Sequence, residues 1–175
     1  MNRVVVTGIG IVSSLGNNQQ EVKESLYHTK SGISFDEDQK KMGFRSCVSG
    51  QIKIDLENSI ERKFLRFMGD GASYNYLSML EAIKDSNLSE DEISNNKTGL
   101  IMGSGGPSTK SLLRAFDITR EKGPKKIGPT SVPKVMCSTN SATLSTYFKI
   151  KGVNYSISSA CSTSAHCIGN AYELI

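Results

Sequence analysis

The chain has 175 residues, enough for one globular core, and 37% of them are hydrophobic against 22% charged, which excludes an intrinsically disordered chain. No apolar run approaches the ~20 residues of a membrane-spanning helix, and a net charge of +4 is too small for a dedicated nucleic-acid-binding protein. The four cysteines form no C-x-x-C pair and follow no export signal, so we expect reduced thiols in the cytoplasm.

The first third of the chain predicts a strand and two helices. Segment 3–12, RVVVTGIGIV, is rich in valine and isoleucine and predicts a buried strand. Asn18 followed by Glu21 predicts the start of a helix, and residues 44–54 look extended. A long helix is expected from Ser59, because apolar residues recur at spacings of three and four. These are Leu65, Met68, Ala72, Tyr76, Met79 and Ile83.

A glycine turn near the N-terminus is similar to the opening of a dinucleotide-binding fold. Gly8-x-Gly10 follows the predicted strand, but Ser13 stands where the fingerprint requires a glycine or alanine for close helix packing. The acidic residues 36–38, at the distance of a ribose-binding carboxylate, follow no convincing strand. We therefore interpret the two glycines as serving tight backbone geometry.

The rest of the chain alternates strands with helices. TGLIMGSGGP (98–107) predicts a buried strand that ends in a glycine-rich turn, and residues 108–120 predict a helix. A loop follows at 121–130, and VNYSISSA (153–160) predicts a third strand that leads directly into a helix. This order indicates an α/β fold with a mainly parallel sheet. The sequence stops at AYELI within the last helical pattern, which indicates a piece of a longer protein.

Cys161 lies at the predicted junction of the third strand and its helix, among serine, threonine and alanine residues. Small neighbours permit a sharp turn and leave the sulfur accessible. A helix N-terminus favours thiolate, and its free N–H groups can stabilise an oxyanion, an effect of ~2.7–4 kcal/mol per donor. This is the pattern of an acyl-accepting nucleophile. On composition alone, a small buried hydrophobic cysteine accounts for it equally well.

No histidine is well placed to serve this thiol as a base. His28 lies in a polar segment, and His166 is rotated about 140° from Cys161 on a helix, so we expect a core or interface histidine. A hydrolase, which would need a histidine close to Cys161, is therefore disfavoured. His166 and Cys167 are adjacent and lack further ligands, so no metal site is expected.

Four segments together resemble the N-terminal part of the β-ketoacyl-acyl-carrier-protein synthases. They are VVVTGIGIVSSLGNN, RKFLRFMGDGA, GLIMGSGGPS and FKIKGVNYSISSACSTSAHCIGNA. The resemblance runs over residues 1–175, and its cysteine stretch is most similar to the type I synthases of fatty acid biosynthesis. It implies a thiolase-like α/β fold, in which two similar halves form an αβαβα layered molecule. Residues 1–175 would be an incomplete N-terminal half, and the catalytic histidines would belong to a C-terminal half absent from this chain.

The resemblance also implies an acyltransferase reaction and names its residues. An acyl group would move from a carrier-protein thioester to Cys161, and decarboxylation of malonyl-carrier protein would supply the carbanion that attacks it. The Cys161 N–H is a candidate oxyanion donor. Met136 is similar to a residue that lines the acyl pocket, although core packing explains it equally well. No cofactor is expected, and the 175-residue chain alone is expected to be inactive.

Two basic clusters, RKFLR (62–66) and REKGPKK (120–126), would otherwise be ordinary solvated surface. Acyl carrier proteins are acidic, so the resemblance implies a docking patch for acyl- and malonyl-carrier protein. Its residues would be Lys63, Arg66, Lys122 and Lys125, with Arg62 and Lys126 at the rim. A cytoplasmic homodimer is implied for the full-length protein, with neither nucleic acid nor membrane as a partner.

Three alternatives remain open at this point. A non-catalytic subunit could dock the carrier protein or pair with a catalytic chain, but such subunits lose the nucleophile that Cys161 retains. A synthase of type II is a close relative with the same chemistry. A thiolase that works without a carrier protein is disfavoured by the basic clusters.

Overall fold

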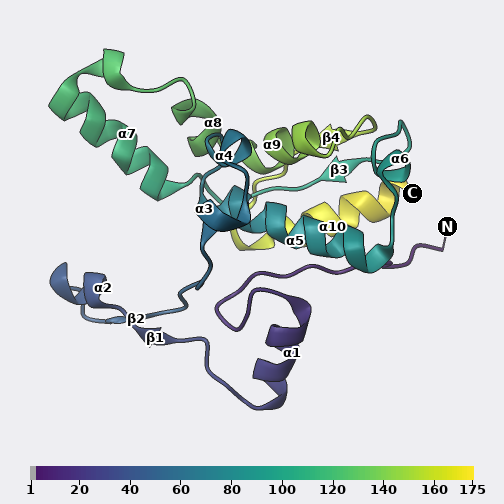
Figure 1. Ribbon diagram of the computed structural model, residues 1–175, viewed down its shortest axis with the longest axis horizontal. Helices are drawn as coiled ribbons and strands as arrows, with labels where there is room; N and C mark the ends of the chain where they lie inside the picture. The colour runs from purple at the N-terminus through teal and green to yellow at the C-terminus, as the bar shows by residue number, and fades with distance from the viewer. Residues whose placement is uncertain (1–2) are drawn as a thin grey trace. The chain divides into compact units, whose positions relative to one another are not determined.

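The computed structural model describes residues 3–175, which divide into two compact units (Figure 1). The first unit holds the residues up to Val6 together with Leu56–Tyr76 and Leu88–Ile175. The second holds Thr7–Asp55 and Leu77–Asn87. Within the described residues, no helix is both long enough and apolar enough to cross a membrane.

The second unit begins its helix where the sequence predicts. Helix α1, Gln19–Tyr27, is capped by Asn18, whose side chain accepts a hydrogen bond from the Glu21 N–H at 2.9 Å. Two short strands, β1 (Ser34–Phe35) and β2 (Val48–Ser49), pair antiparallel on either side of α2 (Glu37–Lys41). The extended segment predicted at 44–54 therefore contributes one strand.

The predicted first strand is wrong, because the structure describes no strand between residues 3 and 12. Val5 and Val6 are 61% and 81% exposed rather than buried. Further along, the Ile9 and Ile11 N–H groups donate to the carboxylates of Asp85 and Glu81, both at 2.9 Å. A run of β-branched residues forms a strand only beside a partner strand, and these backbone donors bind side chains instead.

The early glycines lie against the second half of a helix. A Cβ at Gly10 would come within 1.7 Å of the Ser78 carbonyl oxygen, and one at Gly8 within 2.3 Å of the Ala82 oxygen. Only glycine permits this approach, which supports the interpretation of Gly8-x-Gly10 as a packing feature rather than a nucleotide-binding turn.

The long helix predicted from Ser59 is instead two helices in the structure, α4 (Arg62–Leu65) and α5 (Asp70–Ser86), and a short helix α3 (Leu56–Ser59) ends where it was predicted to begin. The helix is interrupted before α5 at Gly69, where an added Cβ would lie 2.9 Å from the Ser108 Cβ and 3.0 Å from the Lys134 carbonyl oxygen. The predicted stripe still faces the interior of the first unit, since Met68, Ala72 and Tyr76 are buried.

The first unit is organised around a parallel pair of strands, as predicted. Strand β3 (Leu100–Ile101) pairs with β4 (Asn154–Tyr155), with Leu100 opposite Asn154. Helix α9 packs against both strands and α10 against β3 (Figure 1). The remaining elements are α6 (Glu90–Ile93), α7 (Thr109–Lys122), the 3-10 turn η1 (Pro124–Lys126), α8 (Ser131–Val135), α9 (Thr139–Tyr147), η2 (Ala160–Ser162) and α10 (Thr163–Leu174).

The core of this unit lies beside α9. Leu144 is fully buried, and the rings of Tyr76 and Tyr147 meet edge to face with their centroids 4.6 Å apart. Burial raises the pKa of Tyr76 above its ordinary value, with hydrogen bonding to Tyr147 acting in the same direction. The scaffold that carries β4 and its following turn is therefore a packed aromatic and aliphatic core.

Candidate active site and cationic cavity

The predicted junction at Cys161 is a sharp turn between β4 and α10. Ser159 has φ −146° and ψ 48°, outside the regular helical and extended regions, and Ala160 adopts φ +49°, in the left-handed region that residues with a Cβ rarely occupy. Cys161 follows in η2 and is exposed, directly before the 12-residue helix α10. The alternative of a small buried cysteine at 161 is therefore wrong.

The small polar residues around Cys161 hold the turn in shape. The Ser159 N–H donates to Thr163 Oγ1 at 2.9 Å, and that hydroxyl donates in turn to the Ala160 carbonyl at 2.8 Å. The Ser162 hydroxyl donates to the Ser159 carbonyl at 2.8 Å. Thr163 is buried, so its hydroxyl serves the backbone of the turn rather than solvent.

The glycine-rich turn after β3 packs against the Cys161 turn. A Cβ at Gly103 would lie 1.8 Å from the Ile157 carbonyl oxygen, and one at Gly105 would lie 2.8 Å from that of Ala160. The buried Asn140 of α9 donates to the Gly103 carbonyl at 3.0 Å. Because the strands are parallel, both turns leave the sheet at the same edge, and glycine allows them to touch.

Cys167 lies in α10, six residues after Cys161 of η2, in a different environment. It is buried, and this burial raises the pKa of its thiol above the ordinary value, partly offset by a hydrogen bond with the backbone of Ile157. Cys161 is exposed at the helix start. The turn before α10 therefore presents an accessible thiol, and α10 itself carries a buried one.

The two histidines are both exposed, so the core alternative for His166 is wrong, and the interface alternative stays a prediction. His28 ends α1 in the second unit, with its ring 5.1 Å from that of Tyr27. The His166 ring turns back toward the start of the turn, where Nδ1 lies 2.8 Å from Ser159 Oγ.

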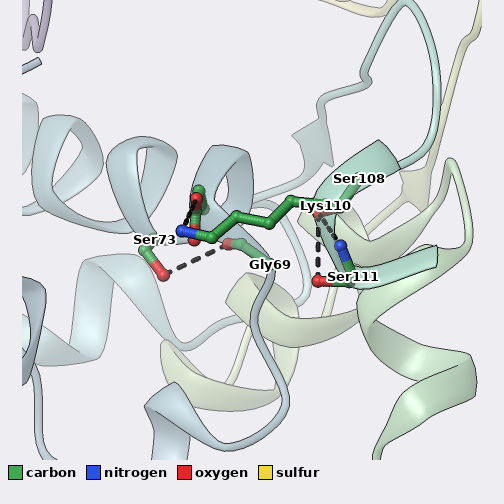
Figure 2. A network of polar contacts seen from close by, with 6 residues as sticks. Gly69, Ser73, Ser108, Lys110 and Ser111 are labelled. Carbon is green, nitrogen blue, oxygen red and sulfur yellow. Dashed lines mark hydrogen bonds and ion pairs between the residues drawn. The ribbon is translucent and has the colours of Figure 1, made fainter. Parts of the chain in front are cut away.

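A cavity of about 880 Å³ opens in the first unit beside α4, α5, α7 and α8. Its described lining includes five cationic side chains, Arg62, Arg66, Lys110, Arg114 and Lys134, against two acidic ones, Glu57 and Asp70. Figure 2 shows Lys110 reaching across to the start of α5, where its Nζ lies 3.0 Å from Asp70 Oδ2. The lining therefore carries five positive and two negative charges, a net charge of +3, so the cavity is strongly cationic.

The structure brings together only part of the predicted docking patch. Arg66 lines the cavity, as does Arg62, which the sequence places at the rim of the patch. Lys63 pairs with Glu61 at 2.7 Å and lies 4.6 Å from the centroid of the Phe64 ring. The two lysines predicted from the loop do not belong to the described lining of the cavity: Lys122 ends α7 and Lys125 lies in η1, both exposed.

Sequence reasoning missed Lys110, Arg114 and Lys134 as members of a charged site. A signal existed for the first two, because they lie four positions apart and so share a face of α7. No local signal marks Lys134, which α8 carries to the cavity. Met136, predicted to line the acyl pocket, is partly exposed and joins α8 to α9, with its carbonyl accepting from the Thr139 N–H at 3.1 Å.

Comparison with known proteins identifies the family. The family model described as "Beta-ketoacyl synthase, N-terminal domain" matches residues 1–175. The chain belongs to the β-ketoacyl synthase family. It is 54% identical over 176 residues to the 3-oxoacyl-[acyl-carrier-protein] synthase 1 of Haemophilus influenzae, an alignment that covers 100% of this chain and 43% of the relative.

Other relatives are consistent with that assignment. The 3-oxoacyl-[acyl-carrier-protein] synthase 2 of Vibrio cholerae is 32% identical over 174 residues, covering 99% of this chain and 42% of that protein. The crystal structure of a β-ketoacyl synthase from Burkholderia phymatum matches with a TM-score of 0.82 at 27% identity, over 99% of this chain and 43% of that one. The predicted thiolase-like α/β fold is confirmed. The chain spans less than half the length of these β-ketoacyl synthases.

Proposed function

We propose that residues 1–175 form the N-terminal half of a 3-oxoacyl-acyl-carrier-protein synthase of fatty acid biosynthesis, with Cys161 as its acyl-accepting nucleophile. The observation that carries this proposal is the turn at Cys161: an exposed thiol follows a left-handed residue at the start of a helix. The 54% identity to a type 1 synthase, against 32% to a type 2 synthase, favours type I chemistry.

In the proposed first half-reaction, the Cys161 thiolate attacks the carbonyl carbon of an acyl thioester. The C–S bond to the carrier's thiol breaks and that thiol leaves, so the acyl group becomes a thioester of Cys161. We assign the Cys161 N–H as one donor to the transient oxyanion, because the first N–H groups of a helical segment have no intrahelical partner. In the second half-reaction, malonyl-carrier protein loses CO₂ and its carbanion forms the new carbon–carbon bond.

We assign the second half-reaction to groups outside this chain. His166 contacts Ser159, and no hydrogen bond between described residues joins a histidine to Cys161. The 175-residue chain alone should therefore form an acyl-enzyme at most. Malonyl-dependent condensation by this chain alone would contradict the assignment.

The partner for the cationic residues is, in this proposal, an acidic acyl carrier protein. Arg66 lines the cavity, while Lys63, Lys122 and Lys125 extend positive charge over exposed surface. Opposite charge of this kind mainly raises the rate of encounter and fixes the orientation of the partner. We place Met136 in the acyl pocket and expect a cytoplasmic homodimer.

A non-catalytic docking subunit is the second candidate, and one experiment separates the two. The full-length protein that contains this chain is incubated with acyl-carrier protein, and the acylated peptide is identified by mass spectrometry. We expect the acyl group on Cys161, and more than a roughly 10³-fold loss of condensation in Cys161→Ala. Cys167→Ala is the control, because this thiol is buried. Acylation that persists in Cys161→Ala, or none in the wild type, would favour the docking subunit.

A further inference from the structure

His166 makes a contact that the proposed reaction does not use. Its Nδ1 lies 2.8 Å from the hydroxyl of Ser159, two residues before Cys161, and the ring is carried by the first turns of α10. The backbone under this ring is held as well, because Asn170 donates to the His166 carbonyl at 2.9 Å. Asn170 Oδ1 in turn accepts from the Tyr155 hydroxyl of β4 at 3.3 Å. The helix backbone that carries the imidazole is thus linked through Asn170 to Tyr155 of β4, and the ring itself contacts Ser159.

Ser159 forms hydrogen bonds through its N–H, its carbonyl and its hydroxyl at the turn. Its N–H is bound by Thr163 and its carbonyl by Ser162, so both backbone groups are tied into the turn itself. Its hydroxyl alone reaches past the turn, to His166. The next residue, Ala160, has φ +49°, a conformation that costs of order 1–3 kcal/mol and persists only when surrounding contacts enforce it.

We propose that His166 is a positioning residue for acyl transfer. Through Nδ1 it anchors Ser159, and this contact holds Cys161 in the orientation required for attack on the acyl thioester. This inference rests on the proposed role of Cys161. It assigns His166 no proton transfer with the thiol, since the ring contacts Ser159. Positioning matters at this site because attack requires a near-attack geometry, and small displacements of a reacting group lower the rate.

The atom that makes the contact gives the proposal a specific test. Asparagine places its amide at the position of Nδ1, whereas glutamine places it one bond further out, near the position of Nε2. His166→Asn can therefore retain a hydrogen bond to Ser159, and His166→Gln and His166→Ala cannot retain it in the same geometry. Ser159→Ala removes the other partner and leaves the ring in place.

The experiment measures the single-turnover rate of Cys161 acylation by acyl-carrier protein in the full-length protein. A net hydrogen bond of this kind corresponds to roughly 3–10-fold in rate. We expect losses of that size for His166→Ala, His166→Gln and Ser159→Ala, and a rate within about 2-fold of wild type for His166→Asn. The double variant Ser159→Ala/His166→Ala should be no slower than either single variant, because both remove the same bond.

Several results would overturn the inference and leave the proposed function standing. They are an unchanged rate in His166→Ala, equal rates in His166→Asn and His166→Gln, or additive losses in the double variant, each with acyl still found on Cys161. A wild-type protein that never acylates Cys161 would overturn both proposals. Slow labelling of the buried Cys167 in every variant verifies that the helix remains folded. If His166→Ala does not fold, the comparison of His166→Asn with His166→Gln decides.

Discussion

The Cys161 turn and the cationic cavity are built in opposite ways. The turn takes its hydrogen bonds from neighbours within a few positions, from Ser159 to His166. The cavity collects its charges from two separate stretches of the chain, 57–70, which runs from α3 through α4 to the start of α5, and 110–134, which runs from α7 to α8. A nucleophile that must be oriented is held by local bonds, whereas a surface for a charged partner requires only that cations gather, and tertiary packing achieves this.

The largest expected effect comes from disrupting the glycine contact beside the Cys161 turn. Gly103→Ala would place a methyl group 1.8 Å from the Ile157 carbonyl and 2.8 Å from the Thr163 side chain. Because the first neighbour is backbone, we expect destabilisation at or above the usual ~1–3 kcal/mol of overpacking. Urea unfolding of the chain measures it. Gly106→Ala is the matched control, since no described atom beyond its chain neighbours lies within 4 Å of that Cβ. Equal midpoints for the two variants would contradict the packing described.

The cavity should respond to charge rather than to shape. Arg114→Glu reverses a charge in its lining, and Arg120→Glu makes the same change on the same helix outside the described lining, where Arg120 lies 5.9 Å from the Phe116 ring. In the full-length enzyme we expect a KM for acyl-carrier protein raised about 3–10-fold by the first variant and less by the second, with kcat unchanged. Added salt should shrink the difference. Equal effects at both sites would show that only overall charge matters.

These two regions also explain what the sequence predicts and what it does not. The cap at Asn18, the helix after Pro107 and the turn at Cys161 were predictable, because their signals are local. Residues 3–12 were mistaken for a strand, since valine and isoleucine indicate strand propensity but not the partner that a strand requires. The break at Gly69 was missed because it follows from contact with Ser108 and Lys134, far along the chain.

The residues of the candidate site also divide into those that have a local sequence signal and those that have none. Cys161 was found from its small neighbours, and Arg66 from a cluster of charges adjacent in sequence. Lys134 lines the cavity because α8 packs beside it, and no local sequence pattern predicts this packing. The contact of His166 with Ser159 was also missed, because helical rotation relative to Cys161 gives no information about a side chain that turns back to the strand.

The smallest expected effect concerns Cys167, the buried thiol of α10. Burial raises the pKa of Cys167, so the folded chain holds this thiol proton more tightly than the unfolded chain does. The resulting stabilisation is complete below the ordinary thiol value of about 8.5, and it is lost as the pH rises through the raised folded value. Wild type should therefore lose more stability than Cys167→Ala between about pH 7.5 and about pH 9.5. Urea midpoints at the two pH values test this, and parallel losses in the two proteins would mean that the thiol of Cys167 ionises as readily in the folded chain as in the unfolded one.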